Sequence, residues 1–181
     1  MSAARHVVVA ASVLMSVGLS STPAIAEASQ VSSPQASIAV TQASRSEMLQ
    51  RAAVWLTANN GKQVPYDQLK VWRDGYRQDC SGYVSMAAAL PKPGPNTVAL
   101  FDNETVAINK ADMLPGDLFI DKTGDHNTRH VVIFEKWANS GHTSYLAYEQ
   151  RGGHGTDHRI LSYGLNAGSQ FQARRLKNIT G

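Results

Sequence analysis

The sequence contains a single cysteine, Cys80, among its 181 residues. One thiol excludes a disulfide within the chain and a zinc site built from several thiolates. Basic residues are not concentrated either: the formal net charge is +3, and the densest basic stretch, Arg174, Arg175 and Lys177, is expected at a solvated strand edge. Because nucleic-acid-binding domains usually carry a strong basic patch, no nucleic-acid partner is expected.

Long hydrophobic runs are also scarce. The one clear run, Val7 to Leu19, has 13 residues and follows Arg5, whereas a membrane-spanning helix needs about 20. Polar residues and Pro23 interrupt it, and Ala24-Ile25-Ala26 has the small-residue pattern of a cleavage site. This pattern predicts a secretory signal peptide over residues 1–26, and a mature protein without a membrane span that is secreted or held at the cell wall.

The segment after the predicted cleavage site is rich in Ser, Ala, Gln and Val. Such a composition is typical of a flexible lead-in, here residues 27–43. No internal repeat is visible, so we expect one folded domain over residues 44–181. We expect this domain to be a monomer.

Helical patterns come first in the predicted domain. Ser44 and Glu47 have the spacing of a capping box, and the apolar residues that follow lie on one helical face as far as Asn59-Asn60-Gly61. A second helix is predicted to begin near Cys80 and to end before Pro91.

Short strand-like runs follow from Asp117 onwards. They are predicted at Asp117–Asp121, His130–Trp137, Thr143–Gln150, His158–Tyr163 and Phe171–Leu176. Helices followed by adjacent strands indicate an α+β fold in which the N-terminal helices pack on an antiparallel β-sheet.

Cys80 lies at the predicted start of the second helix, where free N–H groups and the helix dipole stabilise negative charge on sulfur. A thiolate is the form that attacks a carbonyl group. The alternative is that Cys80 is a small buried apolar side chain. Gly82 favours the first interpretation, because a glycine in the first helical turn indicates that something approaches the backbone closely.

A nucleophilic cysteine needs a base, and His130 is the best candidate because it opens an apolar strand. The other reading is a surface histidine at a strand end. Two pairs, His126 with His130 and His154 with His158, have the spacing of a metal site on a helix. Their segments are rich in Gly, Asp, Asn and Thr and do not look helical, so no metal site is expected.

Four motifs in order resemble those of the NlpC/P-sixty family of bacterial cell-wall cysteine peptidases. They are Val64-Pro65-Tyr66, Asp79-Cys80-Ser81-Gly82-Tyr83-Val84, Leu114-Pro115-Gly116-Asp117-Leu118-Phe119 and His130-Val131-Val132-Ile133-Phe134. The similarity extends over about residues 48–176.

This resemblance implies a papain-like fold in which Cys80 attacks an amide carbonyl and His130 acts as the base. It also implies that the Tyr66 hydroxyl and the Cys80 N–H stabilise the oxyanion, and that Asp79 and Ser81 bind the amine end of a peptidoglycan peptide. The expected bond is the γ-D-glutamyl link to the diamino acid. Neither a metal nor an organic cofactor is implied.

The third catalytic residue is the point at which the sequence departs from the family. His142 has the family's usual distance from His130, but 138–141 has the composition of a hairpin turn. Pairing across that turn places Glu149 or Gln150 opposite His130, and a one-residue change of register decides between them. We favour Glu149, because a carboxylate both orients the imidazole and stabilises its charged form.

Three functions are compatible with these patterns. The first is an exported cysteine peptidase that cleaves peptidoglycan stem peptides. The second is an amidase or acyltransferase that acts on another substrate, because one fold supports many reactions. The third is an exported binding module that retains the fold without turnover, against which the intact Cys-His pair argues.

Overall fold

The computed structural model describes residues 42–181. The predicted signal peptide (1–26) and all but the last two residues of the predicted lead-in (27–43) lie outside these residues.

The helices are α1 (Arg45–Val54), α2 (Cys80–Ala87) and α3 (Thr97–Ala99), with a π-helical segment η1 (Leu100–Glu104) and a 3-10 turn η2 (Lys110–Asp112). The strands are β1 (Ala43–Ser44), β2 (Asp67–Val71), β3 (Arg77–Gln78), β4 (Thr105–Ala107), β5 (Leu118–Asp121), β6 (His130–Trp137), β7 (Tyr145–Arg151), β8 (Gly155–Leu161), β9 (Gln172–Leu176) and β10 (Ile179–Thr180).

Six of these strands form one sheet in the order β4-β9-β5-β6-β7-β8, and every neighbouring pair is antiparallel. The α+β prediction is therefore confirmed. Two short pairs lie outside this sheet: β1 pairs with β10 in parallel, and β2 pairs with β3. The β1–β10 pair joins the first and last strands of the described chain.

Helix α1 begins at the predicted capping box. The Ser44 hydroxyl accepts a hydrogen bond from the Glu47 N–H, and the Glu47 carboxylate accepts one from the Ser44 N–H at 2.9 Å. The helix ends at Val54, earlier than predicted: the N–H groups of Leu56 and Thr57 bond to carbonyls three residues earlier, and Asn60 and Gly61, with left-handed backbones, form a separate tight turn. No helix within residues 42–181 is long and apolar enough to cross a membrane.

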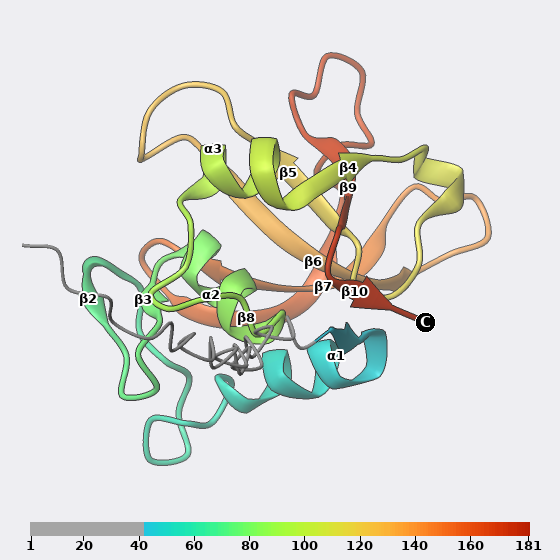
Figure 1. Cartoon of the computed structure of the whole chain (residues 1–181). Coiled ribbons are helices and arrows are strands. Elements are labelled where there is room, and N and C mark those ends of the chain that lie inside the picture. Colours follow the sequence, from blue (N-terminus) through green and yellow to red (C-terminus); the bar gives the residue numbers. More distant parts are fainter. Residues whose placement is uncertain (1–41) are drawn as a thin grey trace, which may run out of the picture. The chain divides into compact units, whose positions relative to one another are not determined.

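Helix α2 lies between α1 and the strands β6 and β7 (Figure 1). Alternate residues of β6 point to opposite faces of the sheet. Val131 and Ile133 belong to the apolar core that contains α1 and α2, whereas Val132 and Phe134 belong to the apolar cluster on the other face. Because both faces are covered, the strand that His130 opens is continuously apolar rather than alternating.

Asp117, the residue before β5, is a fully buried carboxylate that connects three segments. It accepts hydrogen bonds from Arg45 of α1 at 3.0 Å, from Arg175 of β9 at 2.7 Å and from the Leu114 N–H at 2.8 Å. Arg174 donates to backbone carbonyls near η1 and β4. The expectation that this basic stretch is a solvated strand edge is therefore wrong, because its arginines hold neighbouring segments in place.

We expect Asp117→Ala to lower the free energy of unfolding by about 3 kcal/mol, because removing one partner of a buried charge network leaves the others uncompensated. Urea denaturation measures this change. The matched control is Asp102→Ala: Asp102 binds Lys122 at 2.6 Å, but its side chain is 46% exposed, so its loss should cost less than about 1 kcal/mol. Equal losses for the two variants would contradict the role given to Asp117.

Candidate functional site

Cys80 is the first residue of α2, as the sequence predicts. The residue before it, Asp79, caps the helix: its carboxylate accepts a hydrogen bond from the Gly82 N–H at 2.6 Å. The N–H groups of the first helical turn have no partners within the helix and carry partial positive charge. Cys80 is only 4% exposed, yet it lines a surface hollow, so its sulfur is positioned in a polarising environment that a small reactant can enter.

Gly82 is required because a strand passes against this turn. A Cβ atom at Gly82 would lie 2.2 Å from the carbonyl oxygen of Arg77, in β3. The close approach expected from the sequence is therefore confirmed, and the approaching group is the chain's own backbone. This contact holds the start of α2 against β3.

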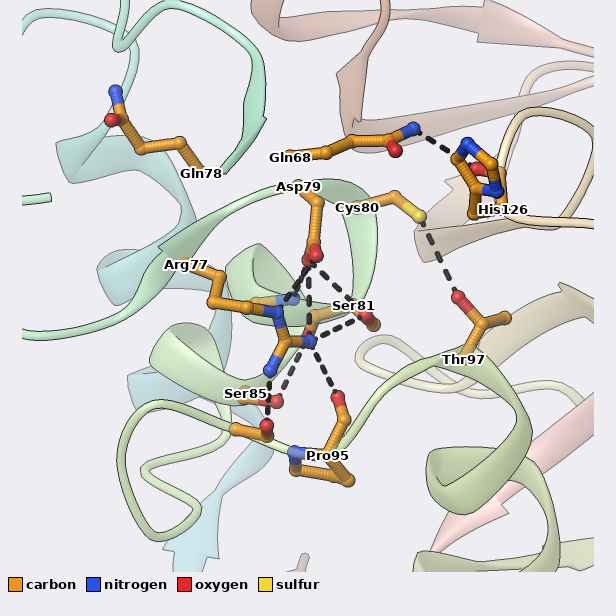
Figure 2. A network of polar contacts seen from close by, with 12 residues as sticks. Gln68, Arg77, Gln78, Asp79, Cys80, Ser81, Ser85, Pro95, Thr97 and His126 are labelled. Atoms are coloured by element: carbon orange, nitrogen blue, oxygen red, sulfur yellow. Dashed lines mark hydrogen bonds and ion pairs between the residues drawn. The ribbon is translucent and has the colours of Figure 1, made fainter. Parts of the chain in front are cut away.

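Arg77 is at the centre of the polar network below Cys80 (Figure 2). Its guanidinium donates to Asp79 at 2.8 Å, to the Ser81 hydroxyl at 2.9 Å and to the Pro95 carbonyl at 2.9 Å. Ser81 in turn donates to Asp79 at 3.1 Å. An amine that binds at Asp79 would therefore have to share the carboxylate with Arg77, a residue that the sequence patterns did not single out.

His130 and Glu149 form the second part of the site. The Nε2 atom of His130 lies 2.8 Å from Oε2 of Glu149, and Glu149 is fully buried. The predicted direct pairing of these residues is wrong, since Glu149 lies opposite Val132 and the loop between β6 and β7 extends to Ser144. A shift of two residues preserves the face of the strand. Glu149 therefore still lies on the same face as His130.

Gln150 points to the opposite face of β7 and is also fully buried. Its Nε2 donates to the Pro65 carbonyl at 3.0 Å and to the Gln78 carbonyl at 3.2 Å. These carbonyls precede Tyr66 and Asp79 in the chain. Gln150 is thus not a partner of His130, but it holds together the two segments that carry Tyr66 and Cys80.

His142 lies in the loop between β6 and β7, away from His130. Its backbone is left-handed, with φ of 52°, and its ring stacks on Trp137 at a centroid distance of 4.2 Å. The prediction that His142 lies at the turn is confirmed.

The charges around His130 favour its protonated form. Burial of the ring lowers its pKa, but interactions with the Cys80 and Glu149 side chains outweigh burial and raise the pKa from 6.5 to about 9. For Glu149, burial raises the pKa, whereas contacts with His130 and Arg159 lower it, and the lowering dominates. An imidazolium that is hydrogen-bonded to a carboxylate favours the thiolate form of a nearby cysteine nucleophile.

Arg159, in β8, is a site residue that the sequence patterns missed. Its Nε lies 2.6 Å from Oε1 of Glu149, and its Nη2 donates to the Tyr163 hydroxyl at 3.2 Å. Tyr163 stacks on Phe171 with centroids 5.0 Å apart, and both rings contact His130 edge-on. The imidazole is therefore fixed by aromatic contacts as well as by Glu149.

Two hollows meet at this site, and three residues line both of them: Tyr66, Gln68 and Arg129. We call one the Cys80 hollow; it is also lined by Asp79, Cys80, Ser81, Asn96, Thr97 and His126. We call the other the His130 hollow; it is also lined by Asn127, Thr128, His130, Arg151, Gly152, Tyr163 and Phe171.

Gln68 connects the two sides of the Cys80 hollow. Its Nε2 donates to the Tyr66 hydroxyl oxygen at 3.0 Å. The same nitrogen donates to the His126 carbonyl at 2.9 Å, a contact drawn in Figure 2. Because the Tyr66 oxygen accepts this bond, its own proton is available to another acceptor. Thr97 adds a further polar contact, with its hydroxyl 3.8 Å from the Cys80 sulfur.

The histidine pairs with metal-like spacing are separated by other contacts. His158 binds Glu135 and stacks on Tyr148, and His154 lies 3.6 Å from Asp157. Within residues 42–181, no three His, Cys, Asp or Glu side chains cluster in the way that a metal site requires.

Comparisons with protein-family models and with curated proteins give no match to this chain.

We expect His130 to titrate near pH 9 and Glu149→Gln to lower its pKa toward the ordinary value, because the neutral amide no longer stabilises the imidazolium. NMR titration of the imidazole resonances measures both values. Because the folded-state pKa is raised, the stabilisation is complete below pH 6.5 and is lost as pH rises through about 9. The difference in the free energy of unfolding between the wild type and Glu149→Gln should therefore become smaller as the pH rises from 6.5 to about 9.

A wild-type His130 that titrates near 6.5, or a pKa unaffected by Glu149→Gln, would contradict the charge arrangement. His142→Gln is the matched control. It removes a histidine of the same hairpin that stacks on Trp137 and has no part in the His130–Glu149 contact, so the His130 titration should stay unchanged.

Proposed function

We propose that this chain is an exported cysteine peptidase of papain-like fold that hydrolyses amide bonds in peptidoglycan stem peptides. The observation that carries the proposal is the contact of the His130 ring with the buried Glu149 carboxylate, in a site where Cys80 begins α2 and contributes to the raised pKa of His130. The four motifs that resemble the NlpC/P-sixty family support the choice of peptidoglycan as substrate, and the signal-peptide pattern supports export.

The order of elements supports a papain-like arrangement. The nucleophile begins a helix that packs against the sheet, the base begins the central strand β6, and the residue that orients the base comes from the next strand, β7. In such an arrangement the helix dipole acts on the thiol and the rigid sheet fixes the imidazole.

In the proposed first step, the Cys80 thiol has already given its proton to His130. The thiolate sulfur attacks the carbonyl carbon of the scissile amide, a carbon–sulfur bond forms, and the carbonyl oxygen becomes an oxyanion. The N–H of Cys80 lies in the first turn of α2 and is not used within the helix. Tyr66 lines the same hollow, and burial raises its pKa, so it keeps the proton that it donates. These two donors stabilise the oxyanion.

In the second step, the protonated His130 gives its proton to the leaving nitrogen, the carbon–nitrogen bond breaks, and a thioester remains on Cys80. Water then attacks the thioester and loses a proton to His130, the carbon–sulfur bond breaks, and the acid product leaves as the Cys80 thiolate and the His130 imidazolium are restored. Glu149 keeps the ring oriented and stabilises its positive charge in both steps.

Digestion of purified peptidoglycan, followed by mass analysis of the fragments, tests this function. The wild type should release peptides with a new amine and a new carboxyl end, and Cys80→Ser should reduce their formation at least 1,000-fold, because the nucleophile and base act as a unit. Hydrolysis in ¹⁸O-labelled water should add one label to the new carboxyl group. Unlabelled products would indicate acyl transfer, no products would favour a binding module, and an active Cys80→Ser would exclude catalysis by this thiol.

Glu149→Ala should reduce kcat on a defined stem peptide by a large factor without abolishing activity, because Cys80, His130 and the oxyanion donors remain. His142→Ala, in the same hairpin, should keep a kcat near that of the wild type and a free energy of unfolding within about 0.5 kcal/mol of it. Steady-state kinetics on one peptide compares the variants. If His142→Ala loses most of its kcat and Glu149→Ala keeps it, then His142, not Glu149, orients the His130 ring.

A further inference from the structure

A further hollow is lined by residues of α1, of α2 and of the turn before β3, and we call it the α1–α2 hollow. Its volume is about 350 Å³, and it shares no lining residue with the Cys80 hollow or the His130 hollow. Val54, Tyr76, Met86 and Ala89 form its apolar lining, and Val54 is 57% exposed. A cavity of this size and lining can hold a small organic molecule.

Two cations line the α1–α2 hollow without an anion to bind. Arg51 forms no ion pair within residues 42–181, and its buried Nη1 has no hydrogen-bond partner there. Lys92 pairs with no described carboxylate either, and its ammonium lies over the Tyr76 ring, 5.4 Å from the ring centroid. A buried donor without an acceptor is costly, so this lining is incomplete without an anion.

Asp74 also lines this hollow, but its carboxylate is already engaged. Oδ2 accepts a hydrogen bond from the Trp55 indole N–H at 2.7 Å, and Oδ1 accepts one from the Tyr76 N–H at 3.2 Å. Glu47, one turn before Arg51 in α1, binds Ser44 instead. Neither carboxylate lies within ion-pair distance of Arg51, so two positive charges face one negative charge in the hollow.

The backbone is strained where it borders the hollow. Ala89 follows the end of α2 with a left-handed backbone, φ of 52°. Its N–H bonds to the Met86 carbonyl at 3.2 Å, and the Leu90 N–H bonds to the Ser85 carbonyl at 2.9 Å. Glycine is the usual residue at this position of such a helix end, because a Cβ atom is crowded there. Strain of this kind is common at ligand sites.

We propose that the α1–α2 hollow binds a small organic anion with an apolar body. The anionic group binds the Arg51 guanidinium and the Lys92 ammonium through charge-assisted hydrogen bonds, and the apolar body covers the exposed Val54. An inorganic anion or a neutral apolar molecule uses only one part of this lining. Because the hollow is separate from Cys80 and His130, the inference does not depend on the proposed function.

NMR titration of ¹⁵N-labelled protein with 4-methylbenzoate tests the site. The assigned amide signals of Val54, Tyr76, Met86 and Ala89 should shift together and give one Kd. Two related compounds separate the parts of the ligand: 4-methylbenzamide keeps the body without the charge, and acetate keeps the charge without the body. Each should bind at least about tenfold more weakly than 4-methylbenzoate.

Lys92→Gln and Arg51→Gln should each weaken the binding of 4-methylbenzoate at least about fivefold and leave the weak binding of 4-methylbenzamide unchanged. The matched control is Lys136→Gln, which removes the same charge. The Lys136 side chain, in β6, is 66% exposed and lies 3.7 Å from Glu135, so the affinity should stay at the wild-type value. Lys92 is exposed, so its replacement alone decides if Arg51→Gln loses the NMR spectrum of a folded protein.

Equal binding of 4-methylbenzoate and 4-methylbenzamide, or an equal loss of affinity in Lys136→Gln, overturns the anion site. Acetate that binds as tightly as 4-methylbenzoate overturns the apolar part of the ligand. Signals that do not shift, or shifts confined to residues around Cys80 and His130, overturn the α1–α2 hollow as the site and leave the proposed function intact.

Discussion

The buried carboxylate of Glu149 lies between two cations, the His130 imidazolium and the Arg159 guanidinium. A carboxylate removed from water is costly unless it is paired and hydrogen-bonded. Here each oxygen has a cationic partner within 2.8 Å. The hydrogen bond from His130 orients the imidazole and, together with Cys80, raises its pKa, so Glu149 influences both the position and the charge of the ring.

Two adjacent residues of β7 support different parts of the site: one contacts His130, and the other binds the segments that carry Tyr66 and Cys80. Glu149 faces the side that holds His130, whereas Gln150 faces the other side and binds the carbonyls of Pro65 and Gln78. A slip of one residue would exchange the two side chains and leave both buried polar groups without their partners. The register of β7 is therefore fixed by its polar residues as well as by its apolar ones.

Local patterns in the sequence predicted much of this arrangement. The capping box of α1, the helix that begins at Cys80, the strand that begins at His130 and the choice of Glu149 all depend on neighbours in sequence or on the alternation of one hairpin. The predicted register was wrong by two residues, but alternation repeats every two residues, so the face was still correct.

Residues that act across distant segments were not predictable in this way. Arg159 reaches Glu149 only because β8 pairs with β7, and the sequence placed the start of β8 three residues too late. Arg77 and Arg129 act through contacts with loops that have no periodic pattern. The early end of α1 has a local origin instead, because the N–H groups of Leu56 and Thr57 bond to carbonyls three residues earlier and tighten the chain into turns.

The central claim is that the Cys80 sulfur becomes covalently attached to the acyl part of the substrate. Rapid acid quenching during the first turnover on a stem peptide, followed by mass analysis of the digested protein, tests this claim directly. The account predicts that the mass of the acyl fragment is added to the peptide that contains Cys80, and to no other peptide. Cleavage products that form in the first turnover while Cys80 stays unmodified, or an adduct on a different residue, would contradict it.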